Sequence, residues 1–164
     1  MKKIKNPWLM LNWKEKYDRD LIHRKGICFV FDKGLNPDVV RSIKSFSLYL
    51  KSCYQFPIRV NIHIKNKNYI QAFDGEHVSA TCFTPFDIYK EPFIRISAGD
   101  FDKLKMQWGK NNALASILHS IAHEITHYYQ WINSLDMDTT KSEWQASYYA
   151  TIAIRKYAET RDEP

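Results

Sequence analysis

The sequence predicts a single domain of the α+β class, because its hydrophobic pattern changes period twice along the chain. Apolar residues recur at helical spacing over residues 37–54, alternate with polar residues over 57–65, and return to helical spacing after Gly109. The chain has 164 residues, of which 45% are hydrophobic, and this is enough for one core. No linker-like stretch and no internal repeat interrupts it. We therefore expect residues 1–164 to form one domain.

The first predicted elements are a short helix, a strand and a longer helix. Residues 1–25 are an N-terminal extension, in which 7–22 have the spacing of a short, irregular helix. Residues 26–32 (GICFVFD) are apolar and rich in β-forming side chains, as in a buried strand. Asn36 is suited to cap the next helix, with Pro37 at its first position and Asp38 near its positive end. The apolar face of that helix continues through about residue 54.

The middle of the chain predicts a small sheet. Apolar and polar side chains alternate in PIRVNIHIK, residues 57–65, which is typical of a half-buried strand. Turn-forming residues at 66–68 and 74–75 flank a short strand, and residues 77–84 and 93–97 are two further strand candidates. We expect these strands to pair in a mostly antiparallel manner. Residues 26–98 would then contain one helix and the whole sheet.

Composition and charge argue against several classes of protein. The net charge is +6 at pH 7, but the basic residues are scattered, so nucleic-acid binding is not expected. No apolar run is long enough to cross a bilayer, and WLMLNW near the N-terminus is too short for a signal peptide. The three cysteines are an odd number, which is uncommon in disulfide-stabilised secreted domains. We therefore expect a cytoplasmic protein that does not bind membranes.

Residues 110–133 predict the helix that carries the chemistry. One arc of this helix is apolar and would face the core. Its members are Leu114, Ile117, Leu118, Ile121, Ile125, Tyr128 and Ile132. The opposite arc contains His123 and His127, and Glu124 lies between the two arcs. Residues 123–127 read HEITH, which matches the pattern HExxH.

The spacing within HExxH has a mechanical reason. Histidines four residues apart project from adjacent turns of one helix face, so that both imidazoles can reach one zinc ion. The intervening glutamate cannot easily join them, but it can remove a proton from water whose pKa the zinc ion lowers. We therefore predict that His123 and His127 bind Zn²⁺ and that Glu124 is the general base of a hydrolase.

A catalytic zinc site needs a third protein ligand. No histidine follows His127, so the downstream carboxylates Asp136, Asp138 and Glu143 are the candidates. Glu143 begins a second helix, residues 140–158, whose small face would allow a close approach to the first helix. Glu143 also completes a capping box with Thr140, in which its carboxylate would only bond the helix start. We predict that Glu143 is the ligand.

The two motifs HEITH and EWQASYYA resemble those of the gluzincin metallopeptidases, and are most similar to the small ImmA/IrrE-type and minigluzincin families. The second motif in that group is approximately E-x-x-A-N-x-F-A. Glu143, Ala146, Tyr149 and Ala150 match it, with Tyr in place of Phe, whereas Ser147 stands where Asn is usual. The resemblance covers about residues 112–155.

The resemblance implies a zincin-like fold, in which a helix backs a short sheet and is followed by the active-site helix 110–133 and the glutamate helix 140–158. It implies a zinc endopeptidase whose substrate is a protein or peptide, in some members a regulatory protein. Such peptidases bind an extended chain along an edge strand, for which residues 77–84 and 93–97 are the candidates.

Further residues remain candidates for the site. His119, Tyr148 and Tyr149 could line the pocket or stabilise an oxyanion. Cys82 lies upstream of HExxH, as the metal-binding cysteine of polypeptide deformylases does, which makes a deformylase-like amidohydrolase an alternative. A second alternative is a non-catalytic, metal-binding interaction module, although Glu124 would then have no purpose.

Overall fold

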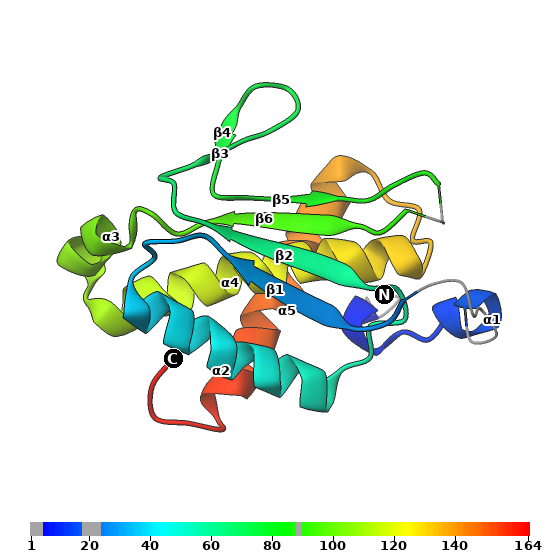
Figure 1. Ribbon diagram of the computed structural model, residues 1–164. Coiled ribbons are helices and arrows are strands. Elements are labelled where there is room, and N and C mark those ends of the chain that lie inside the picture. The colour runs from blue at the N-terminus through cyan, green and yellow to red at the C-terminus, as the bar shows by residue number, and fades with distance from the viewer. Residues whose placement is uncertain (1–4, 18–23, 88–89) are drawn as a thin grey trace.

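The computed structural model describes residues 5–17, 24–87 and 90–164, which form one α+β domain (Figure 1). Its elements in chain order are a 3₁₀ helix η1 (Pro7–Leu9), α1 (Trp13–Tyr17), β1 (Ile27–Phe31), α2 (Pro37–Cys53), β2 (Val60–Lys65), β3 (Ile70–Gln71), β4 (His77–Val78), β5 (Ala80–Phe83), β6 (Phe93–Ser97), α3 (Phe101–Trp108), α4 (Lys110–Ile132) and α5 (Thr139–Ala158). The two long helices that end the chain begin and end within one residue of the predicted ranges.

Local sequence signals account for several of these boundaries. The Asn36 side chain accepts a hydrogen bond of 2.9 Å from the backbone N–H of Asp38, so the predicted cap of α2 is confirmed. Helix α3 was not predicted, because it is short and Phe101 is its only buried residue. The predicted helix over 7–22 is η1 and α1 in the described part, and residues 18–22 lie outside the described residues.

The expectation of a mostly antiparallel sheet is wrong. The four-stranded sheet has the order β1-β2-β6-β5, in which β1 pairs with β2 and β2 with β6 in parallel, and only β5 and β6 are antiparallel. Helix α2 connects β1 to β2, and such a crossover makes the two strands parallel. A separate antiparallel pair, β3 and β4, stands away from the sheet (Figure 1).

The strict alternation in β2 had suggested antiparallel pairing, because parallel strands are usually covered on both faces. In this protein the helices cover one face of the sheet. Val60, Ile62 and Ile64 are buried on that face, whereas the residues between them are half-buried on the other. A parallel strand with one open face shows the same alternation as an antiparallel strand.

The core lies between the sheet and the helices α2 and α4. Buried isoleucines of β2 and β6 meet the apolar arc of α4, all of whose predicted members are buried. The N-terminal extension joins this core, since Trp8 is buried and its Nε1–H donates a 2.8 Å hydrogen bond to Thr126 Oγ1 on α4. None of the described helices is both long and apolar enough to span a membrane.

Candidate metal centre

Two tyrosines fix the position of α4 against the loop before β2. The Tyr128 hydroxyl donates a 2.6 Å hydrogen bond to the carbonyl of Ile58 and accepts one of 3.2 Å from the same residue's N–H. The Tyr129 hydroxyl donates a 2.9 Å bond to the carbonyl of Gln55. Both rings are buried. Helix α4 therefore cannot rotate without breaking these bonds, and its polar arc is held toward α5 and β5.

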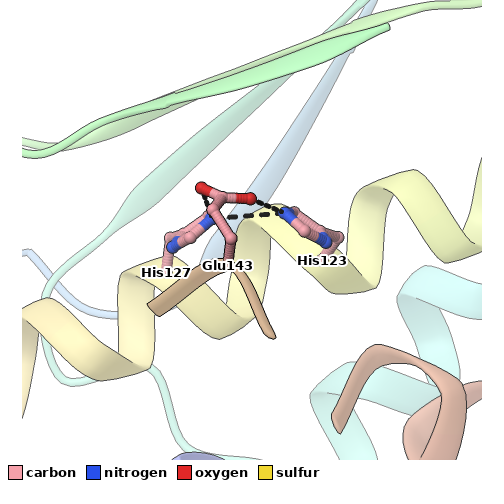
Figure 2. A group of neighbouring side chains, drawn as sticks. All are labelled: His123, His127 and Glu143. Atoms are coloured by element: carbon pink, nitrogen blue, oxygen red, sulfur yellow. Dashed lines mark hydrogen bonds and ion pairs between the residues drawn. The ribbon is translucent and has the colours of Figure 1, made fainter. Parts of the chain in front are cut away.

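His123, His127 and Glu143 meet in one cluster (Figure 2). The Nε2 atoms of the two histidines lie 3.2 Å apart. Glu143 Oε2 lies 3.1 Å from His123 Nε2, and Glu143 Oε1 lies 3.1 Å from His127 Nε2. The histidines come from α4, and the carboxylate reaches across from the first turns of α5. The structure therefore brings together the three residues that the sequence predicted as ligands.

The donor set of this cluster fits a zinc ion. Around a tetrahedral zinc ion with ligands at about 2.0–2.1 Å, neighbouring ligand atoms lie roughly 3.3 Å apart. The separations of 3.1–3.2 Å in the cluster are close to that value. Two imidazoles and one carboxylate are the ligand set expected of a catalytic site that keeps a fourth position open. Burial and the neighbouring His127 lower the pKa of His123, which favours the neutral form that binds metals.

Gln130 determines which nitrogen of His127 faces the cluster. Its Nε2 donates hydrogen bonds of 3.0 Å to the backbone carbonyl of Ser142 and 2.9 Å to Gln145 Oε1, which orients the amide. Its Oε1 therefore points at His127 Nδ1, 2.8 Å away. An amide oxygen only accepts, so His127 Nδ1 carries the proton. In the neutral ring, Nε2 is then unprotonated and faces Glu143, with its lone pair directed into the cluster.

The hydroxyl of Ser147 contacts the other histidine of the cluster, His123. Its Oγ lies 3.3 Å from His123 Nδ1. Ser147 thus contacts the histidine from the position that is Asn in the motif E-x-x-A-N-x-F-A. On the next turn, Thr151 Oγ1 donates to the carbonyl of Ser147 and therefore accepts the 3.1 Å hydrogen bond from His119 Nε2. Polar side chains of α5 thus orient the ring of His123 and anchor that of His119.

Glu124 lies beside the ligand cluster and is 7% exposed. Burial raises the pKa of its carboxyl to about 8, and the negative charge of Glu143 adds to this effect. The carboxyl is not part of the ligand group, although it lines the same cleft. A positive charge at the cluster would favour its ionised form. This placement suits a proton acceptor and donor better than a ligand.

The alternatives for the third ligand do not join the cluster. Asp138 is the N-cap of α5, because its Oδ1 accepts a 2.9 Å hydrogen bond from the backbone N–H of Lys141. The capping box with Thr140 is therefore not formed, and the Glu143 carboxylate contacts the histidines instead. Asp136 is likewise outside the ligand group found among the described residues. Small residues make the approach of α5 possible, since Ala146 and Ala150 are fully buried.

The cluster lies in an open cleft of about 1150 Å³ between α4, α5 and the strand β5. Its described lining includes His123, Glu124, His127 and Glu143, together with β5 from Ala80 to Cys82. Strand β5 is an edge strand, so one of its sides is not paired within the sheet. Two segments were expected to offer a free strand edge to a substrate. Residues 77–84 do so, because they contain β5. Residues 93–97 do not, because β6 lies between β2 and β5.

The other predicted site residues do not belong to the ligand group. His119, Tyr148 and Tyr149 are not among the described residues that line the cleft. Tyr148 stacks on Trp144 with ring centroids 5.2 Å apart, and Tyr149 is buried in the core. Cys82 lines the cleft but is outside the ligand group, and burial raises the pKa of its thiol well above the ordinary value. A neutral thiol is a poor metal ligand.

We did not predict from the sequence that Gln130, Ser142 and Thr151 contact or orient residues of the site. Gln130 follows His127 by three residues on the same helix, and this spacing puts the two side chains side by side. That signal was available from the sequence, whereas the partners on α5 were not. No protein-family model, no curated protein and no solved structure matches this chain.

Proposed function

We propose that this protein is a zinc-dependent endopeptidase of the gluzincin type on a zincin-like fold. The observation that carries the proposal is the convergence of His123 Nε2, His127 Nε2 and the Glu143 carboxylate beside the buried Glu124, in an open cleft. Three electron-pair donors at about 3 Å repel one another unless a cation or proton lies between them. In the neutral imidazole, the proton on His127 Nδ1 leaves Nε2 with a lone pair for a metal ion.

The residues of the cleft divide the reaction between them. A zinc ion held by His123, His127 and Glu143 would supply a Lewis acid that polarises the substrate carbonyl and lowers the pKa of water. Glu124 accepts a proton from the water that attacks this carbonyl. It then passes the proton to the amine nitrogen as the peptide bond breaks, so that the carboxylate is regenerated. Its buried position keeps this proton from exchanging freely with bulk water.

The edge strand β5 supports a polypeptide as the substrate. An extended chain can add to the unpaired side of residues 80–83 through backbone hydrogen bonds, as in other cases of strand addition. Such a chain would cross the cleft above Glu124 and the cluster. Backbone pairing recognises any extended segment, which is why we propose an endopeptidase rather than an enzyme for a small amide.

The test is hydrolysis of an internally quenched peptide library by zinc-loaded protein. Glu124→Gln should bind zinc as the wild type does, while hydrolysis falls by at least about a hundredfold, because the general base is lost. Undiminished hydrolysis by the purified variant would contradict the mechanism. If wild-type protein binds zinc and peptides but cleaves none of them, the protein is an interaction module instead.

A further inference from the structure

A second groove lies on the open face of the sheet, beside the β3–β4 pair. It has a volume of about 1170 Å³. Lys65, Phe93 and Arg95 form its floor, and they alternate along β2 and β6 with the buried isoleucines, so they point away from the helices. Residues 67–73 of the hairpin form its wall. Ala72 and Phe73 line both this groove and the catalytic cleft, so the two hollows meet at the hairpin.

The groove is positively charged. Lys65, Lys67 and Arg95 line it, and its described lining contains no aspartate or glutamate. Asp32 neutralises part of this charge, because its carboxylate lies 3.3 Å from the Lys65 ammonium. Three cations and one carboxylate leave two net positive charges. The acidic residues of the hairpin, Asp74 and Glu76, line the catalytic cleft instead. Charge is therefore separated across the hairpin.

Arg95 has hydrogen-bonding capacity that the described residues do not use. One Nη2–H donates a 3.2 Å hydrogen bond to the carbonyl of Gln71, whereas the Nε atom is buried and has no partner among the described residues. A buried donor without a partner costs free energy, and few remain so in folded proteins. The Nε atom is shielded from solvent, so an anion in the groove would accept hydrogen bonds from the remaining N–H groups at the Nη end of the guanidinium. The floor of the groove is thus suited to receive an anion.

We infer that this groove binds an acidic segment of the polypeptide substrate, next to the segment that is cleaved. This inference rests on the proposed peptidase function, because the groove shares Ala72 and Phe73 with the cleft along which the substrate would lie. Single-stranded nucleic acid is the other anionic polymer, but it needs free aromatic faces for its bases. Here Phe93 stacks on Phe83 at 5.0 Å and Tyr69 stacks on His77 at 3.7 Å, so Phe73 is the one largely exposed ring of the described lining, and a single ring is no series of stacking faces.

The direct test is fluorescence anisotropy with two labelled decapeptides, one containing six glutamates and the other six glutamines at the same positions. The protein is the full chain with Glu124→Gln, which leaves the peptides uncleaved. We expect the glutamate peptide to bind at least about tenfold more tightly at low salt, and Arg95→Gln to remove about tenfold of its affinity. Lys67→Gln, at an exposed position, should weaken binding less. Arg155→Gln is the matched control, since it removes the same charge from exposed α5.

Equal binding of the two peptides, or equal effects of Arg95→Gln and Arg155→Gln, would overturn the inference. A twelve-residue oligothymidylate that binds more tightly than the glutamate peptide, in a manner dependent on Arg95, would assign the groove to nucleic acid instead. If Arg95→Gln does not fold, Lys67→Gln and Arg95→Lys provide the same comparison, because the latter keeps the charge but loses the guanidinium.

Cleavage assays separate this inference from the proposed function. An acidic tail on a cleaved peptide should lower KM about tenfold, and Arg95→Gln should abolish that difference. Cleavage with equal KM for acidic and neutral tails would contradict the groove but not the peptidase. Selective binding of the glutamate peptide by a protein that cleaves nothing would contradict the peptidase and leave the groove as a peptide-binding site.

Discussion

Gln130 lies one turn after His127 on α4, and its Oε1 accepts a 2.8 Å hydrogen bond from His127 Nδ1. This contact leaves His127 Nε2 free to bind a metal ion. We expect Gln130→Leu to weaken zinc binding by about 10–100-fold, because the ring loses both its orientation and its fixed proton. Chelator competition measures the affinity, and ¹⁵N NMR of the metal-free protein should show His127 in a mixture of tautomers.

The matched control for that variant is Gln145→Leu. Gln145 is buried and its Oε1 accepts a hydrogen bond from Gln130 Nε2, but among the described residues no hydrogen bond joins it to His127. The Gln145→Leu variant should lower the free energy of unfolding by about 1–3 kcal/mol, as expected when a buried hydrogen bond is broken, and should change zinc affinity much less. Equal loss of zinc affinity in the two variants would show that Gln130 acts only through stability.

Asp138 and Glu143 should separate capping from metal binding. Asp138→Ala removes the cap of α5 and should cost about 1 kcal/mol of unfolding free energy, with nearly unchanged zinc affinity. Glu143→Gln should leave the metal-free protein about as stable as the wild type, but weaken zinc binding sharply, because a neutral amide is a poor ligand for a dication. Denaturant unfolding of metal-free protein and zinc titration provide the two readouts. The reverse pattern would make Glu143 the cap.

Sequence alone could predict the part of the site that lies on one helix. His123, Glu124 and His127 have their relative positions set by the helical repeat, and the apolar arc of α4 indicates which side faces the core. Glu143 could also be predicted, because a short turn joins the two helices and the small residues Ala146 and Ala150 allow α5 to pack closely against α4. These inferences needed only local geometry.

Other features depend on how the elements pack and could not be predicted in the same way. The direction of β2 relative to β6 is decided by the route of the chain between them, and the alternation of side chains is the same for either direction. The capping box suggested Thr140 as the cap of α5, and only the observed start of the helix shows that Asp138 is the cap. Gln145 and Thr151 contact α4 residues because of the way the two helices face each other.

Cys82 tests the deformylase-like alternative. Cys82→Ala should leave zinc content and hydrolysis close to wild type, because the thiol is outside the ligand group and burial keeps it protonated. Thermal unfolding of the variant accounts for any loss of packing. Loss of zinc from a folded Cys82→Ala protein would place the thiol among the ligands and remove Glu143 from them.

Glu124 should make the stability of the metal-free protein depend on pH. Burial raises the pKa of its carboxyl from 4.5 to about 8, so between these values the folded state binds more protons than the unfolded state. The free energy of unfolding therefore falls as pH rises through this window. Glu124→Gln removes this contribution, and its stability relative to wild type should rise by about 4 kcal/mol from pH 4 to pH 8.

Denaturant unfolding at several pH values, with chelator present, measures this difference. Glu159→Gln, which removes the same charge from an exposed position, is the control. A difference between Glu124→Gln and wild type that stays constant over the window would mean that Glu124 ionises normally, and so is not held in the buried environment that suits a general base.

The most direct test of the central claim is the zinc content of the purified full-length chain, measured by elemental mass spectrometry after saturation with zinc and removal of the excess. We expect one zinc ion per chain in wild type and Glu124→Gln, and strongly reduced zinc in folded His123→Ala, His127→Ala and Glu143→Ala. Wild-type protein without stoichiometric zinc, or unchanged zinc in the two histidine variants, would contradict it.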